Sequence, residues 1–173
     1  MRTDEFPTGP DPLASARIND DLSEAEASAE TERDISSLVG AAFSETLRRV
    51  ALRVMGEGAD AEQAIAGGAF VLDDSTVVIR LNPETNFVEF FCDVGQPDTY
   101  ALEAGYRAAL EANLCRTFPG ITLGIHPESG RLVATMAFNG LLVDNEELFM
   151  QMLQSLVGCA RQIRESGLFA FEG

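Results

Sequence analysis

The sequence predicts an α+β fold in which helices pack on a twisted antiparallel sheet, with the element order α-β-β-β-α-β-β-α. Two observations lead to this prediction. Apolar residues recur at helical spacing in three segments, and five short segments between them carry strand signals, two of which, residues 76–82 and 87–94, alternate with a period of two. Short polar connectors join the alternating segments, as in antiparallel hairpins. With 173 residues, 46% of them hydrophobic, the chain suits one domain with a tail.

The first helix is expected to begin at Ile35, where large apolar residues start to recur at the i, i+4 and i+7 spacings of one helix face. Glycines just after Met55 are expected to end it. Leu38, Leu52 and Met55 lie outside the main apolar face. This helix therefore carries more apolar surface than one core face requires.

The strands follow a pair of glycines after the first helix and form two groups. The first three are expected to form an antiparallel meander, and the last two a hairpin around a turn that contains the only histidine, His126. In the second and third strands, both faces carry apolar residues. The five predicted strands cover residues 70–73, 76–82, 87–94, 121–125 and 132–138.

The second helix, expected over residues 98–115, has two apolar sides. One side carries a row of large residues, which can pack on the sheet: Leu102, Tyr106, Leu110 and Leu114. The side almost opposite carries small residues: Ala101, Ala104, Gly105, Ala108 and Ala112. A helix that is apolar on two sides must be covered on both. The small row would admit either another helix of the same chain or the same helix of a two-fold partner.

The last helix is expected over residues 144–165, with Asp144 at its start and acidic residues in its first turn, where they suit the helix dipole. Its apolar residues cover more than half of its circumference. The surplus can belong to the core, or it can form an exposed patch that binds a partner.

Residues 1–34 differ from the rest of the chain, because they hold ten acidic residues against three arginines and few large apolar residues. Such a segment buries too little apolar surface to offset the entropy lost on ordering. We expect residues 1–34 to form an acidic tail that is disordered, flexible or weakly helical, and residues 35–173 to form the folded domain.

The net charge of −16 opposes binding to nucleic acids and to anionic membrane surfaces, and all 12 basic residues are arginines. No apolar run approaches the ~20 residues that span a bilayer, and the N-terminal residues carry no apolar segment of a signal peptide. We therefore expect a soluble, cytoplasmic protein without membrane insertion.

The residues that usually perform catalysis do not converge in this sequence. His126 is the single histidine and is expected in a solvated loop, so a histidine-rich metal site is excluded. Cys92, Cys115 and Cys159 lack the spacing of zinc ligands and are expected to be buried, small apolar residues. Phosphate-binding glycine motifs and the GxSxG motif of hydrolases are absent. We expect no enzyme activity, no metal and no cofactor.

One segment carries a recognisable pattern. The stretch ALEANLCRTFPGITLGIHPESGRLVATMAF, residues 109–138, runs from the end of a helix through a strand, a turn and a second strand. The segment LLVDNEELFMQMLQSLVGCARQIRE, residues 141–165, follows as a closing helix with an acidic start. Together with the element order, size and acidity, this pattern resembles the class I type III secretion chaperones, the Tir-chaperone family. The likeness covers about residues 35–165, and the acidic tail departs from it.

The resemblance implies a homodimer without catalytic activity in the bacterial cytoplasm. Its partner would be the N-terminal chaperone-binding segment of a secreted effector or translocator, kept soluble and competent for secretion. Such a segment would bind in extended form, by adding a strand to a sheet edge and by seating apolar side chains in patches. The alternative is a non-catalytic adaptor or regulator of similar fold that binds a folded partner.

Candidate residues for these two surfaces are apolar residues beyond the need of one core face. For effector binding they are Leu38, Leu52, Met55, Val71, Val133 and Met136. For the dimer interface they are the small residues of the second helix: Ala101, Ala104, Gly105, Ala108 and Ala112.

Overall fold

The computed structural model describes residues 12–171, and the side chains of Thr31 and of residues 33–171. The chain divides into two units, Met1–Leu38 and Val39–Gly173. Helix α1 (Pro12–Met55) runs through the described part of the first unit and into the second. It ends before Gly56, as predicted, but begins well before Ile35. Residues 12–34 are rich in alanine and glutamate, which favour helix without forming an apolar stripe. The expected flexibility of residues 1–34 stays a prediction, and residues 1–11 lie outside the described residues.

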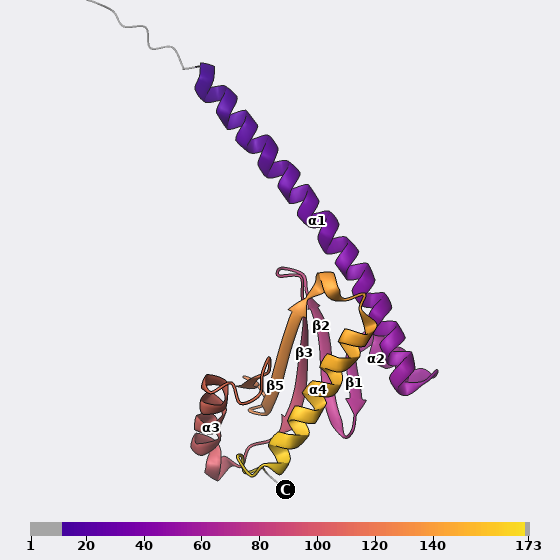
Figure 1. Cartoon of the computed structure of the whole chain (residues 1–173), viewed down its shortest axis with the longest axis vertical. Helices are drawn as coiled ribbons and strands as arrows, with labels where there is room; N and C mark the ends of the chain where they lie inside the picture. The colour runs from indigo at the N-terminus through magenta and orange to yellow at the C-terminus, as the bar shows by residue number, and fades with distance from the viewer. Residues whose placement is uncertain (1–11, 172–173) are drawn as a thin grey trace, which may run out of the picture. The chain divides into compact units, whose positions relative to one another are not determined.

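The second unit is built on a five-stranded antiparallel sheet with the order β1-β2-β3-β5-β4 (Figure 1). The first three strands form the predicted meander, the last two form the predicted hairpin, and β5 pairs with β3. The strands are β1 (Ala69–Leu72), β2 (Ser75–Asn82), β3 (Phe87–Gly95), β4 (Thr122–Ile125) and β5 (Leu132–Asn139). The predicted fold class, an antiparallel α+β sheet packed with helices, is confirmed. Homodimerisation stays a prediction.

Three further α-helices accompany the sheet, and one of them was not predicted. Helix α2 (Ala59–Gly67) is short and rich in alanine, so it gives little periodic signal. Helix α3 (Leu102–Leu114) follows a 3-10 turn, and α4 (Glu146–Glu165) follows another. The start of α4 is capped by Asn145 rather than by Asp144: the Asn145 side chain accepts a 3.0 Å hydrogen bond from the Leu148 N–H.

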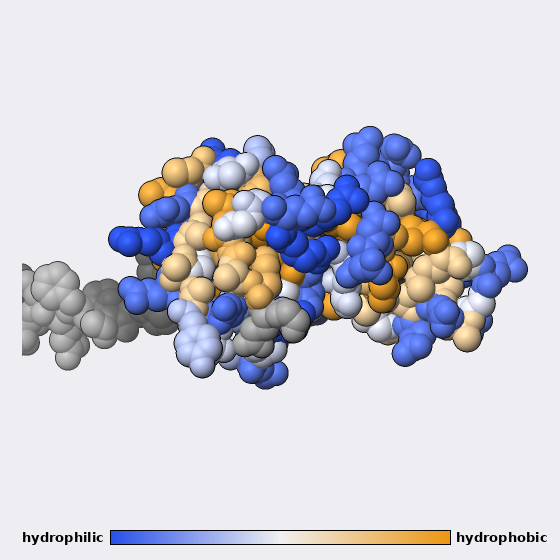
Figure 2. Space-filling view, turned by 90° about the horizontal axis from the view of Figure 1, so that it is seen from below, coloured by the Kyte–Doolittle hydropathy of each residue, from blue (hydrophilic) through white to orange (hydrophobic). Residues whose placement is uncertain are grey.

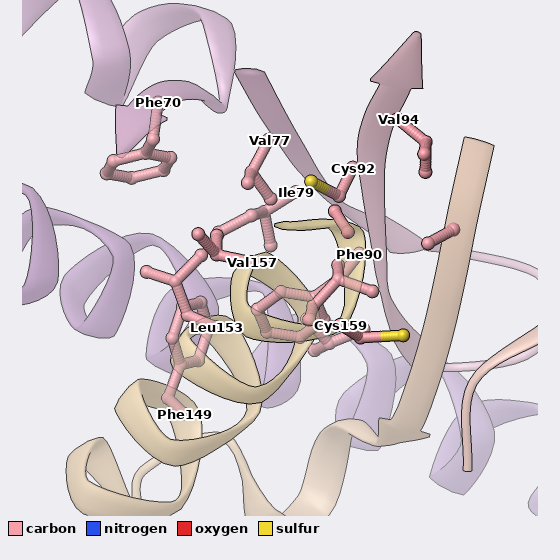
Figure 3. Packing of buried hydrophobic residues seen from close by; sticks show 14 of the residues in the cluster. Phe70, Val77, Ile79, Phe90, Cys92, Val94, Phe149, Leu153, Val157 and Cys159 are labelled. Carbon is pink, nitrogen blue, oxygen red and sulfur yellow. The ribbon is translucent and has the colours of Figure 1, made fainter. Parts of the chain in front are cut away.

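The core lies between α4 and one face of the sheet, called here the inner face (Figures 1 and 3). At its centre, the rings of Phe90 and Phe149 meet edge to face at 5.0 Å between centroids, and Phe138 lies 6.1 Å from Phe149. Phe90 and Phe149 are fully buried, and burial of each such ring stabilises the fold by roughly 1.5–3 kcal/mol. Alternate residues of β2 and β3 supply this face, as the period-two pattern predicted.

Helix α3 packs with its small residues inward, which reverses one expectation. Gly105, Ala109 and Ala112 are buried, whereas Leu110 is 68% and Leu114 is 84% exposed. The prediction that the large row packs on the sheet is therefore wrong. Small side chains let the helix backbone approach its neighbours closely: a Cβ added at Gly105 would lie 3.7 Å from the Phe169 ring.

Candidate functional site

The face of the sheet opposite α4, called here the outer face, is the candidate site. Residues of β2 alternate strictly, with Ser75, Val77 and Ile79 buried on the inner face and the residues between them exposed. Among the described helices, none buries the outer face. This face includes Val71, Thr76, Val78, Arg80, Phe91, Asp93, Val133 and Thr135, according to the strand register.

Apolar side chains on the outer face come together across neighbouring strands. Val78 of β2 pairs directly with Phe91 of β3, and Val133 of β5 pairs with Asp93. Together with Pro127 of the β4–β5 turn, these residues line a groove of about 490 Å³. The groove is therefore an apolar depression that lies across three strands, with polar side chains at its margins.

Two ion pairs order the margins of this groove. The Arg80 guanidinium lies over the Phe91 ring at 4.6 Å from its centroid, and its Nε donates to Glu89 Oε2 at 2.7 Å. This hydrogen bond, opposed by partial burial, lowers the pKa of Glu89 below its ordinary value of 4.5. The Arg131 guanidinium holds Asp93 through Nε and Nη2, at 2.9 and 2.7 Å from Oδ2. The hydrogen bond to Asp93 raises the pKa of Arg131.

The six candidate residues for partner binding occupy three environments. Val71 is 64% exposed on the outer face, and Val133 is half-buried in the groove. Met55 and Met136 are half-buried against the core. Leu52 is half-buried on α1. Leu38, also on α1, is 71% exposed and belongs to the first unit. The structure thus brings only Val133 into the groove, with Val71 on the same face.

Sequence reasoning missed Val78 and Phe91, which line the groove together with Val133. The signal was present, because both strands carry apolar residues on both faces. Alternation alone does not tell which of two apolar faces the helices cover.

The small residues of α3 divide between two environments. Gly105 and Ala112 are buried within the chain. Ala101, Ala104 and Ala108 instead line an open depression of about 600 Å³ on the outer side of the helix. Beside them, the large side chains of α3 are exposed. The solvent side of this helix therefore combines a shallow depression with prominent apolar side chains.

The potentially reactive residues occupy ordinary structural positions. His126 is exposed in the β4–β5 turn, as expected, and its Nδ1 accepts a 3.3 Å hydrogen bond from the Ser129 N–H. Cys92 and Cys159 are buried as expected, but Cys115 is exposed at the end of α3, which corrects the prediction for that residue. Within residues 12–171, no group of three or more His, Cys, Asp or Glu side chains is placed to hold a metal ion. No described helix is long and apolar enough to cross a membrane.

Comparisons with known proteins agree with this architecture. Residues 59–164 match the model of the Tir chaperone protein (CesT) family. Among solved structures, the HopA1-SchA chaperone-effector complex contains a chain that matches with a TM-score of 0.52 and 14% identity, over 71% of this chain and 94% of that one. A chain of the ExsC-ExsE complex matches with a TM-score of 0.48 and 15% identity, over 56% of this chain and 71% of that one. No curated protein sequence matches. Since the family model spans more than half of the sequence, from α2 to the last turns of α4, this chain belongs to the Tir chaperone protein (CesT) family.

Proposed function

We propose that this protein is a type III secretion chaperone of the bacterial cytoplasm, which binds the N-terminal segment of a secreted effector or translocator. The observation that carries this proposal is the uncovered outer face, where Val78, Phe91 and Val133 line an apolar groove on an otherwise acidic protein. Exposed apolar surface of this kind marks a binding site. Membership of the Tir chaperone protein family supports the same role.

An extended segment suits a groove that lies on a β-sheet. Side chains of an extended chain project alternately to opposite sides, with ~6.6–6.8 Å between residues i and i+2. Every second side chain of the partner would enter the groove, and the others would face solvent. The outer edge of β1 carries backbone groups that no described strand pairs, so a partner strand could add there as well.

The binding unit in this proposal is a homodimer formed through the solvent side of α3. Tyr106, Leu110 and Leu114 are exposed there. Soluble monomeric proteins rarely expose large contiguous apolar patches to water. Because a two-fold axis places the same helix of a second chain on this side, each copy would cover the apolar row of the other.

The role proposed here is binding without catalysis. His126 and Cys115 are exposed, and among the described residues neither makes a hydrogen bond or ion pair with a side chain that would activate it as a base or nucleophile. A chaperone requires only that the partner segment stay bound and unfolded until release.

The test combines affinity capture with a single substitution in the groove. The tagged full-length protein is recovered from its own bacterium, and co-eluting proteins are identified by mass spectrometry. We expect a secreted effector or translocator that is no longer retained once its N-terminal segment is deleted. Val78→Glu places a carboxylate in the groove and should abolish its recovery.

Leu142→Glu is the matched control, because Leu142 is also exposed and apolar but lies on the 3-10 turn before α4. Circular dichroism establishes that both variants stay folded. Recovery of the effector with Val78→Glu at the level of the wild type would contradict the groove assignment. Recovery only of folded proteins that bind without an N-terminal segment would favour the adaptor alternative.

A further inference from the structure

A second cavity, of about 650 Å³, adjoins the apolar groove at the end of the sheet. The two cavities share Thr76 and Asp93 as lining residues. Beyond them, the second cavity is lined by three arginines: Arg131, Arg161 and Arg164. Figure 2 views this end of the molecule and shows strongly hydrophilic side chains gathered between two regions richer in apolar side chains. We call the second cavity, with its three arginines, the arginine cavity.

Two of the three arginines already have partners in the fold. Arg131 is paired with Asp93. Arg164 donates to Ser75 Oγ at 2.7 Å and to the Asp93 backbone carbonyl at 3.3 Å, so it ties α4 to β2 and β3. The Arg161 side chain is exposed and has no ion pair or hydrogen bond within the described part of the chain. Its guanidinium group therefore keeps its hydrogen-bond donors and its positive charge available in the cavity.

We propose that the arginine cavity binds one carboxylate of the same extended partner segment whose apolar side chains fill the groove. Arg161 is the primary contact. Arg164 adds its positive charge, since its hydrogen bonds in the fold go to a hydroxyl and a backbone carbonyl. This inference rests on the proposed function, because it assigns a specificity element to the same surface. A guanidinium group binds a carboxylate through two parallel hydrogen bonds, so the contact fixes register as well as charge.

The same cavity limits how much acidic charge the partner can carry. Asp73 and Asp74 of the β1–β2 turn line it as well as the arginines, and both are exposed. Both have left-handed backbone dihedral angles, with φ of 46° and 59°, as in a tight hairpin turn. A second carboxylate beside the first would meet these aspartates. The partner segment should therefore carry a single acidic residue at a fixed distance from its apolar residues, rather than an acidic run.

The test uses a library of random twelve-residue peptides displayed on phage. The library is selected in parallel on the full-length wild type, on Arg161→Glu and on Arg48→Glu. Arg48 is an exposed arginine of α1 outside both cavities, so the control changes the net charge by the same amount. A selected peptide and its Asp→Asn or Glu→Gln counterpart are then synthesised with a fluorescent label and titrated by anisotropy.

The wild type and Arg48→Glu should both select peptides with apolar residues two positions apart and one acidic residue at a constant offset. Arg161→Glu should lose the acidic preference, and its affinity for the selected peptide should fall at least tenfold. Neutralising the acidic residue of the peptide should cause a similar loss with the wild type, and little further loss with Arg161→Glu.

The other outcomes separate the two proposals. The wild type could select apolar peptides without a preference for an acidic residue, or Arg161→Glu could keep that preference. Either result would overturn the role of the arginine cavity and leave the groove assignment intact. Failure of all three proteins to enrich apolar peptides would overturn the proposed function, and this inference with it.

Discussion

Asn113 of α3 and Leu123 of β4 are joined by two hydrogen bonds of 2.8 Å each. Asn113 Nδ2 donates to the Leu123 carbonyl, and Asn113 Oδ1 accepts from the Leu123 N–H. One side chain thus satisfies both backbone groups of a residue in an edge strand. Together with the buried small residues of α3, this pair fixes the helix against the sheet and leaves its large residues in solvent.

Asn113→Ala should reduce the free energy of unfolding by about 1–3 kcal/mol, because both polar groups of Leu123 lose their partner in a partly buried position. Urea denaturation followed by circular dichroism measures the change. Asn139→Ala is the control, since the Asn139 side chain accepts one exposed hydrogen bond, from the Leu141 N–H. An equal loss in the two variants would show that the Asn113 pair has no special role.

The ion pair between Arg80 and Glu89 should make stability depend on pH in the acidic range. Because the pKa of Glu89 is lowered in the folded state, its stabilisation is present above the ordinary value of 4.5 and is lost as the pH falls through the folded value. The melting temperature of Glu89→Gln should lie below that of the wild type at pH 7. The difference should shrink as the pH falls through the folded-state pKa of Glu89, because the wild-type carboxyl group then becomes protonated.

The size of this effect is small, since Arg80 is largely exposed and surface pairs contribute at most ~1 kcal/mol. Glu84→Gln is a suitable control, because Glu84 is exposed in the β2–β3 turn and makes no ion pair among the described residues. If the melting temperatures of the wild type and Glu89→Gln differed by the same amount from pH 7 to pH 3, the stabilisation would not come from the charge of Glu89.

The three cysteines should differ in reactivity. Burial raises the pKa of both Cys92 and Cys159 to about 11, so both remain protonated at pH 8. Cys115 is exposed. Titration with a disulfide reagent at pH 8 should therefore show one fast thiol per folded chain and two more after denaturation. Cys115→Ser should remove the fast reaction, and two fast thiols in the native wild type would disprove the burial of the other cysteines.

The core of the fold was predictable from the sequence because its physical signal is local. Short apolar segments located all five strands, two of them through period-two alternation, and a helical stripe located α4. Helix α2 escaped because nine residues rich in alanine give little contrast between faces. The early start of α1 escaped because polar helix formers carry propensity without periodicity. The order β3-β5-β4 required tertiary information, since local patterns do not tell which strand of a hairpin joins the meander.

The candidate site was predictable only in part. Of the six residues chosen for their excess apolar character, Val71 and Leu38 are exposed, whereas Leu52, Met55 and Met136 are half-buried, and their role in binding stays a prediction. On α3, the large row was expected inward because large side chains usually bury more area, yet Gly105 and Ala109 took that place. The buried small residues and the two hydrogen bonds of Asn113 hold this side of the helix against its neighbours, and Leu110 lies in solvent. Which side of α3 is packed therefore depends on its contacts with the edge strand β4, and the sequence of the helix alone does not contain this information.

The dimer proposed through α3 can be tested by separating its solvent side from its packed side. Leu110→Glu places a charge in the exposed apolar row and should shift the protein from dimer to monomer in sedimentation velocity. Circular dichroism should show that the monomeric variant is still folded. Ala104→Trp fills the open depression and should weaken the dimer by overpacking. Leu168→Glu, an exposed leucine beyond α4, is the control and should leave the mass unchanged. If the wild type sediments as a monomer, or if both α3 variants remain dimeric, the solvent side of α3 is not the interface.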